Sequence, residues 1–193
     1  MSDSFKDTIK SHFDAVNSLL SIQDRIDAAA SAMIEATRSG GTIYWMGNGG
    51  SAADAQHYAA ELMVRYSIDR PPIKSLALTT DSSLLTAHSN DYEYDTVFER
   101  QVEAFATPND VVVGISTSGN SKNVQLALQM AKKKKAIAIG LLGKDGGVIR
   151  EHCDIPIVVG SNVTARIQEA HLIIGHHLCE TVERAHAGLK NTT

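Results

Sequence analysis

The sequence predicts an α/β fold in which a parallel sheet of about five strands carries helices on both faces. Short apolar runs with the length of buried strands alternate with longer segments of helical periodicity, which is typical of parallel sheets. Two loops rich in glycine and serine follow the ends of two of these runs. Ligands bind beyond the carboxyl ends of parallel strands, so these loops mark the expected site.

The chain of 193 residues is 43% hydrophobic with a net charge of −4, so we expect a single domain spanning 1–193. The acidic balance disfavours a nucleic-acid partner. No apolar stretch approaches the roughly 20 residues of a membrane helix, and the N-terminus carries charges where a signal peptide is apolar. Cys153 and Cys179 fit no metal spacing. These features predict a cytoplasmic protein without a membrane partner.

Two amphipathic helices are expected before the first strand. Apolar residues recur every three to four positions over 3–20 and again from Ile22 to Ile34, and Ser39-Gly40-Gly41 ends the second helix. A plain α/β domain does not need this helical extension of residues 1–40. We expect it to pack against another subunit or to cover the sheet.

Strands and helices then alternate to the end of the chain. Ser51 followed by Asp54 has the pattern of a capping box, so Ser51 is expected to cap the first helix after a strand. Asn90-Asp91 is expected to break the helical stretch around it, and Pro156 places the last strand at a sheet edge. Strands are expected at 42–46, 73–78, 111–115, 136–142 and 155–159, and helices at 51–66, 81–89, 92–105, 122–135 and 164–186.

The first loop, Gly47-Asn48-Gly49-Gly50-Ser51, has the composition of an anion-binding turn. Glycines allow a ligand to approach the backbone closely, and the start of the following helix offers free N–H groups. With Ala52 the loop also matches the dinucleotide fingerprint G-x-G-x-x-[GA], which would indicate a nicotinamide-dependent oxidoreductase. That fingerprint expects an acidic residue about 20 positions further on, whereas Asp81 lies about 30 positions on. A tight turn without a ligand is the third interpretation.

The second loop, 116–121, offers four hydroxyl groups at the start of a helix and no cation. Hydroxyl and N–H groups can hold a phosphate dianion there. A helix cap alone would need only one of these residues. The four hydroxyl-bearing residues are Ser116, Thr117, Ser118 and Ser121.

His57 and Glu61 are four residues apart, so they share one face of a helix. The spacing fits two metal ligands, an acid/base pair or an ordinary surface pair. The closing helix adds further candidates at Gln168, Glu169, His171, His176 and His177.

Histidine and carboxylate side chains suit zinc. Gln168 and His176, eight residues apart, can converge on one side of a helix. Spacing does not select His176 over His171 or His177.

Five segments together resemble the sugar isomerase (SIS) domain family and, within it, the phosphoheptose isomerases. The resemblance implies a three-layer fold and a homotetramer with active sites at subunit interfaces. It also implies conversion of D-sedoheptulose 7-phosphate to D-glycero-D-manno-heptose 7-phosphate through a cis-enediol, the first step towards lipopolysaccharide heptose. The segments are GNGGSAADAQHYAAEL at 47–62, LTTDSSLL with SNDY within 78–92, ISTSGNSKNV at 115–124, LLGKDGG at 141–147 and ARIQEAHLIIGHHLCE at 165–180.

The resemblance also implies a role for individual residues. Glu61 and His176 would be the proton-transfer pair, and the phosphate would lie against Ser116, Thr117, Ser118 and Ser121. The chain departs from some relatives at Ala165, where they carry an acidic residue. The implied zinc ligands are His57, Glu61, Gln168 and His176, and the other implied substrate contacts are Asn48, Gly49, Gly50, Glu61, Asn90, Asp91 and Gln168.

Two alternatives remain to the hypothesis that the chain is a heptose phosphate isomerase. One is a non-catalytic protein that associates with the replication initiator, as a close relative of the family does. That relative lacks the carboxylate matching Glu61 and the imidazole matching His176, and this chain has both. The other is an isomerase of a different sugar phosphate, such as arabinose 5-phosphate.

Overall fold

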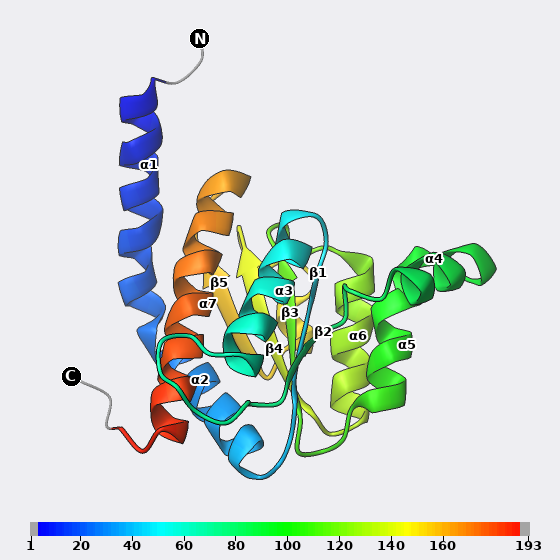
Figure 1. Ribbon diagram of the computed structural model, residues 1–193. Helices are drawn as coiled ribbons and strands as arrows, with labels where there is room; N and C mark the ends of the chain where they lie inside the picture. Colours follow the sequence, from blue (N-terminus) through cyan, green and yellow to red (C-terminus); the bar gives the residue numbers. More distant parts are fainter. Residues whose placement is uncertain (1–3, 190–193) are drawn as a thin grey trace.

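The computed structural model describes residues 4–189; the first three and last four residues, which the predicted domain includes, lie outside this range. A five-stranded sheet lies at the centre and helices cover both of its faces (Figure 1). The predicted α/β architecture and the two leading helices are therefore confirmed. Within residues 4–189, no helix has the length and apolar character needed to cross a membrane.

All neighbouring strands of the sheet are parallel, in the order β2-β1-β3-β4-β5. The edge position of β5 is as predicted, because the proline in this strand cannot donate to a further neighbour. Each strand lies within two residues of its expected bounds. The strands are β1 (Ile43–Gly47), β2 (Ser75–Ala77), β3 (Val111–Ser116), β4 (Ile137–Gly143) and β5 (Ile155–Val159).

The chain changes direction across the sheet between β1 and β3. It leaves β1 for β2 on one side and returns to β3 on the other. Gly47, the last residue of β1, pairs with Ile115 near the end of β3. The loops that follow these two strands therefore begin side by side, at the kind of reversal point where parallel sheets bind ligands.

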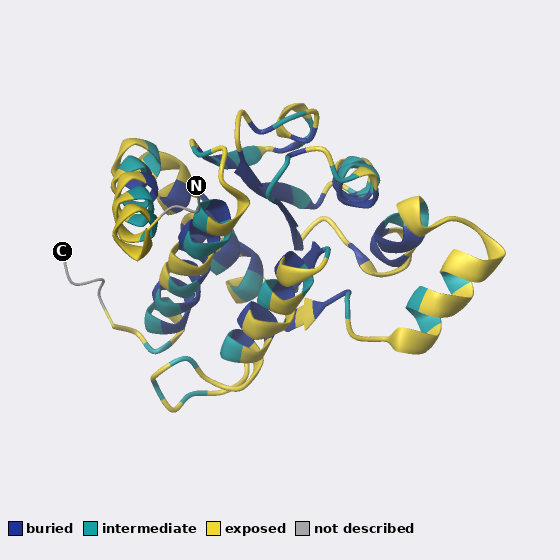
Figure 2. Cartoon of the chain, turned by 90° about the horizontal axis from the view of Figure 1, so that it is seen from above, coloured by how far each residue is buried: buried dark blue, intermediate teal, exposed yellow. Residues whose placement is uncertain are grey.

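Each face of the sheet has its own hydrophobic core. Side chains of α2, α3 and α7 form one core, and side chains of α5 and α6 form the other. Helix α1 lies beside α7, and α4 projects from the body with none of its residues buried (Figures 1 and 2). The α-helices are α1 (Phe5–Ser18), α2 (Gln23–Arg38), α3 (Gly50–Met63), α4 (Ser82–Asp91), α5 (Val97–Phe105), α6 (Lys122–Lys133) and α7 (Thr164–His186), and the 3-10 helices are η1 (Leu19–Ile22), η2 (Tyr94–Thr96) and η3 (Arg150–His152).

Two local expectations were wrong. Ser51 does not cap α3, because Gly49 is the N-cap residue with a φ of 55° and no side chain makes a capping bond. The left-handed backbone of Gly49 lets the helix begin ahead of Ser51. The residues Asn90-Asp91 form the last turn of α4 rather than a break, because helical hydrogen bonding continues past them, to the N–H of Tyr92, which donates to the carbonyl of His88.

Helices α3 and α7 approach each other closely on one face of the sheet. A Cβ atom added to Gly175 of α7 would lie 2.2 Å from the ring of Tyr58 on α3. The Tyr58 hydroxyl donates a hydrogen bond to the carbonyl of His171 over 2.9 Å, and its ring lies 5.3 Å from that of Trp45. The missing side chain at Gly175 therefore decides how near the two helices lie.

Gly175→Ala is expected to lower the free energy of unfolding by about 1–3 kcal/mol, because the added methyl group must displace the buried Tyr58 ring. Urea denaturation followed by circular dichroism measures the change. Gly160→Ala is the matched control, since an added Cβ there meets nothing within 4 Å. Equal stability of the two variants would contradict the close packing described for α3 and α7.

Candidate functional site

The glycine loop connects the carboxyl end of β1 to the start of α3. Gly47 ends the strand, and Gly49 turns the chain into α3 with its φ of 55°. A Cβ on Gly50 would lie 2.3 Å from Nε2 of Gln168, so the side chain of Gln168 rests on this loop. The structure thus places Asn48, Gly49 and Gly50 at the predicted site and brings Gln168 from α7 to meet them.

The serine loop after β3 carries a cluster of hydroxyl groups. Ser116 Oγ lies 2.9 Å from Ser121 Oγ and 3.5 Å from Ser118 Oγ. Ser121 precedes α6 without making a side-chain capping bond to it. Thr117 is half-buried beside them. The N-terminus of a twelve-residue helix therefore faces hydroxyls that are not occupied in capping it, which is an arrangement suited to an anion.

The turn that follows β4, residues 143–149, packs against the serine loop and supports it. Gly119 has a φ of 69°, and a Cβ there would lie 2.2 Å from the carbonyl oxygen of Gly146. The N–H of Ile149 donates to Gly119 O over 3.0 Å, and the N–H of Val148 donates to the Asn120 side chain over 3.2 Å. The sequence alone did not assign this role to the segment 143–149.

Helices α3 and α7 bring three chemically active side chains together. His57 Nε2 lies 2.8 Å from His176 Nε2, and it lies 3.6 Å from Glu61 Oε1. The His176 ring also lies 5.8 Å from the ring of Tyr66. The predicted pairing of His57, Glu61 and His176 across two helices is therefore what the fold produces.

The two other histidines named on the closing helix lie elsewhere. His171 is fully buried, and its Nε2 is 3.1 Å from the carbonyl oxygen of Leu142. Burial lowers the pKa of His171 to about 4, so this imidazole is neutral near pH 7. His177 is exposed and faces a hollow beside η1 and α2. Helical spacing left these three histidines equivalent, and the structure places only His176 beside His57, in agreement with the residue that the resemblance implied.

Glu169 joins α7 to the N-terminal helix instead of entering the site. Its carboxylate contacts the Arg166 guanidinium and lies 2.7 Å from Nδ1 of His12. The hydrogen bond from Arg166, more than the one from His12, holds the pKa of Glu169 below its usual range. Arg166 also donates to the carbonyl of Thr8 over 3.2 Å, so this cluster anchors α1 along α7.

Asn90 and Asp91 are not brought to the other predicted residues. Both are exposed at the end of α4, and the Asn90 amide donates to the Asp91 carboxylate over 2.8 Å. Helix α4 stands away from the body of the molecule (Figure 2). In a single chain, these two residues therefore lie outside the cluster formed by the loops and by α3 and α7.

Asp54 belongs to the site although its sequence position suggested a helix cap. It lies one turn before His57 on α3 and is half-buried. Burial raises the pKa of Asp54, while the nearby His57 and His176 act in the opposite direction. The available signal was its spacing of three residues from His57.

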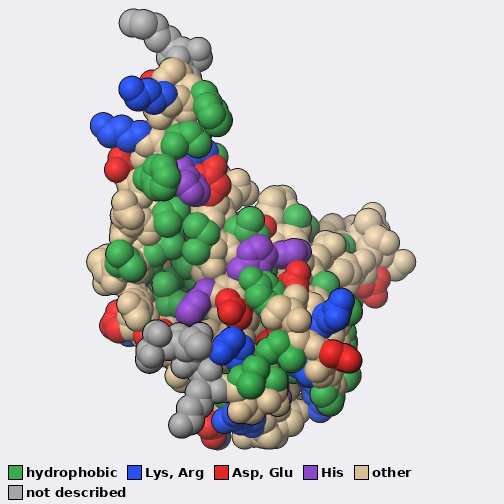
Figure 3. All heavy atoms as spheres, turned by 60° about the vertical axis from the view of Figure 1, so that its left-hand side comes forward, with side chains coloured by type: hydrophobic (Ala, Val, Ile, Leu, Met, Phe, Trp, Pro, Cys, Tyr) green, Lys and Arg blue, Asp and Glu red, His purple; other side chains and the backbone are tan. Residues whose placement is uncertain are grey.

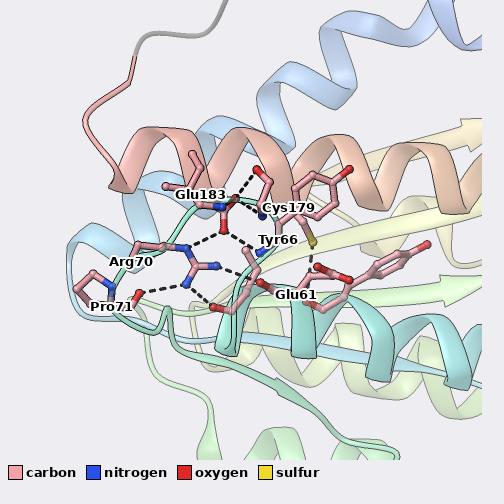
Figure 4. A network of polar contacts seen from close by, with 10 residues as sticks. Glu61, Tyr66, Arg70, Pro71, Cys179 and Glu183 are labelled. Atoms are coloured by element: carbon pink, nitrogen blue, oxygen red, sulfur yellow. Dashed lines mark hydrogen bonds and ion pairs between the residues drawn. The ribbon is translucent and has the colours of Figure 1, made fainter.

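A buried ion pair holds the ends of α3 and α7 together (Figure 4). Glu183 has no solvent exposure and lies 3.2 Å from Arg70 Nε. Its carboxylate accepts N–H groups from the three residues 66–68 over 2.7–3.0 Å. Although burial alone would raise it, these bonds leave the pKa of Glu183 below its usual value. Arg70 in turn donates to the carbonyl of Glu61 over 3.0 Å, so the network reaches the backbone of a site residue.

The site has a partial donor set for a metal ion. Two imidazole nitrogens face each other, and the Glu61 carboxylate lies near one of them. In the described part of the chain, no group of three or more His, Cys, Asp or Glu side chains is already arranged as a metal site. The geometry also suits proton transfer between a carboxylate and an imidazole.

The family comparison defines the class of protein. Residues 4–143 match the family model of the SIS domain. A solved phosphoheptose isomerase from Neisseria gonorrhoeae superposes with a TM-score of 0.82 at 38% identity, covering 93% of this chain and 98% of that one. Another from Francisella tularensis gives 0.85 at 32% identity, covering 94% and 100%. The fold is that of SIS-domain proteins, and the chain belongs to this family.

Relatives of higher identity narrow this class. A phosphoheptose isomerase of Geobacter sp. (strain M21) is 48% identical over 185 residues, which is 95% of this chain and 96% of the relative. That of Solidesulfovibrio magneticus is 55% identical over 158 residues, 82% and 77% of the two chains. The chain belongs to the phosphoheptose isomerase family and is a sugar phosphate isomerase. The nicotinamide hypothesis, which rested on the glycine fingerprint, is not supported.

Proposed function

We propose that this isomerase converts D-sedoheptulose 7-phosphate to D-glycero-D-manno-heptose 7-phosphate through a cis-enediol. The observation that carries the proposal is the convergence of Glu61, His57 and His176 between α3 and α7. The names of the relatives support a heptose phosphate as substrate. The reaction would supply the first precursor of lipopolysaccharide heptose.

The serine loop would bind the phosphate. Its hydroxyl cluster and the start of α6 offer donors without a cation, which suffices for a dianion at a helix N-terminus. Binding energy from the phosphate would then position the distant reacting carbons. The glycine loop, with Asn48, Gly49 and Gly50, would contact the sugar backbone between the two ends.

Glu61 and His176 would share the proton transfers. Glu61, as carboxylate, would take the proton from C1 of the ketose, which leaves an enediol across C1 and C2. His176 would move protons at the two oxygens, which an imidazole can do near neutral pH. Arg70 would hold the backbone of Glu61 in place through its hydrogen bond to the Glu61 carbonyl, near the C-terminal end of α3.

We also propose that His57, Glu61, Gln168 and His176 hold a zinc ion. The fit rests on the two imidazole nitrogens that face each other 2.8 Å apart and on the neighbouring carboxylate. When bound, such an ion would polarise the substrate carbonyl or hold the four side chains in place. Gln168 lies against the glycine loop, which would contact the sugar backbone, so it would bind both the zinc ion and the substrate.

Incubation of the protein with sedoheptulose 7-phosphate and zinc in D₂O, followed by proton NMR, is expected to show the aldoheptose 7-phosphate with deuterium at C2. The proton that Glu61 takes from C1 would exchange with D₂O on the carboxylate before a deuteron is returned to C2. Glu61→Gln should remove the activity by at least about a hundredfold, because an amide cannot accept the proton. Glu103→Gln, on the exposed surface of α5, should keep it.

Full activity of Glu61→Gln would contradict the assignment of the base. Conversion of arabinose 5-phosphate in place of the heptulose would favour the isomerase of another sugar phosphate. Absence of turnover with any sugar phosphate would favour a protein that associates with the replication initiator. The presence of both Glu61 and His176 argues against that last alternative.

The zinc proposal predicts that metal-free protein takes up about one zinc ion per chain, measured by calorimetry and by elemental analysis after dialysis. His57→Ala and His176→Ala should each weaken zinc binding by about 10- to 100-fold. His177→Ala is the control, because this adjacent imidazole is exposed and points elsewhere. Equal zinc binding by all three variants would contradict the ligand set.

A homotetramer with active sites at subunit interfaces is the assembly that we propose. Large apolar side chains are exposed along α1, η1 and one side of α7, where Figure 3 shows hydrophobic atoms gathered over the N-terminal helix. A second subunit would also supply neighbours for α4, which carries Asn90 and Asp91 away from the rest of the site. The exposed apolar residues on this surface of α1, η1 and α7 are Phe5, Ile9, Phe13, Leu20, Leu172 and Ile173.

Sedimentation velocity is expected to show a tetramer that Leu20→Glu dissociates, because the side chain of Leu20 is 77% exposed in a single chain and would become buried at the interface. Phe105→Glu places the same charge on an exposed apolar residue at the end of α5, on the opposite side of the molecule (Figure 1). It should leave the tetramer intact. A monomeric wild-type protein would contradict the assembly.

A further inference from the structure

We propose that Tyr94 and Asn48 together bind one hydroxyl group of the open-chain sugar, and that Asn123 sets the polarity of this contact. The inference deepens the proposed function, since it assigns a substrate group to a part of the same site. It rests on a hydrogen-bond network that joins three elements of the fold. Neither Tyr94 nor Asn123 was singled out by the sequence.

The network lies between the two loops. Asn48 belongs to the glycine loop, Asn123 lies at the second position of α6, and Tyr94 begins η2. The side-chain amides of Asn48 and Asn123 form a reciprocal pair with two bonds of 2.9 Å. The Tyr94 hydroxyl lies 2.9 Å from Asn48 Oδ1.

One backbone group determines every donor and acceptor in this network. The N–H of Val124 can only donate, and it lies 3.0 Å from the Asn123 side chain, so that atom must be the carbonyl oxygen Oδ1. The other end of the Asn123 amide is therefore a donor, and it faces an acceptor, Oδ1 of Asn48. Since Asn48 Oδ1 accepts, the Tyr94 hydroxyl must donate to it.

This polarity leaves a defined pair of free functions at the site. Asn48 Nδ2 uses one N–H on Asn123 and keeps the other as a donor. The Tyr94 hydroxyl donates its hydrogen bond to Asn48, and the lone pairs of its oxygen stay available as acceptors. Asn48 is only half-buried and Tyr94 is 50% exposed, so both functions are open to a ligand.

A hydroxyl group complements such a pair, because it accepts from the Asn48 N–H and donates to the Tyr94 oxygen. A carbonyl oxygen or a phosphate oxygen could use only the first of these bonds. Asn48 directly precedes Gly49, the N-cap residue of α3, and it bonds to Asn123 in the first turn of α6, just after the serine loop. It would therefore bind a hydroxyl of the carbon chain between the phosphate and the reacting carbons.

The test uses calorimetric binding of a heptitol 7-phosphate, an open-chain polyol that cannot be isomerised. Tyr94→Phe is expected to weaken binding about 3- to 10-fold, the loss expected for a neutral hydrogen bond, with an unchanged melting temperature. Tyr92→Phe is the matched control, because this nearby Tyr is 66% exposed and stacks on His88 through its ring. Wild-type affinity in Tyr94→Phe would overturn the inference.

Single-deoxy analogues of the polyol distinguish substrate contact from a structural role. For the analogue that lacks the bound hydroxyl, Tyr94→Phe should cause no further loss, whereas for the others the two losses should add. Additive losses with every analogue would show that Tyr94 acts only on the local structure and would overturn the inference. Polyol binding by a protein that shows no turnover would contradict the proposed reaction and leave this inference standing.

Discussion

The buried carboxylate of Glu183 organises the half of the molecule that carries the reactive side chains. It accepts three backbone N–H groups from the chain that leaves α3 and pairs with the nearly inaccessible guanidinium of Arg70. Removing one partner of such a pair costs about 3–5 kcal/mol, because the other charge stays buried. The reactive side chains of α3 and α7 are therefore held in register by a contact at the C-terminal ends of these two helices.

The close approach of α3 and α7 has a steric condition as well. Gly175 lies under the ring of Tyr58, and Gly50 lies under the amide of Gln168. At both positions a side chain of one helix occupies the place of a Cβ atom on the other. His57 and His176 can face each other at 2.8 Å because these two glycines let the surrounding backbones come together.

The sheet supplies the other half of the site. Parallel pairing of β1 with β3 brings the glycine loop and the serine loop to one edge, although 69 positions separate Gly47 from Ser116 in the numbering. The amide pair of Asn48 and Asn123 then connects the glycine loop to the first turn of α6, which directly follows the serine loop. Phosphate binding and sugar binding are thus expected to be coupled through one short network.

The sequence by itself determined the α/β class, the parallel strands and the two loops at strand ends, because buried strands and helices leave regular apolar patterns. Its resemblance to a family also pointed to Glu61 and His176. Helical spacing alone did not separate His176 from His171 and His177, because it cannot show what faces each side of α7; the tertiary structure shows that His176 faces His57 while His171 is buried against Leu142. It also decided that Ser51 is no cap, that Asn90 and Asp91 stand apart in one chain, and that Tyr94 meets Asn48. These features depend on contacts between residues far apart in sequence, which no local pattern records.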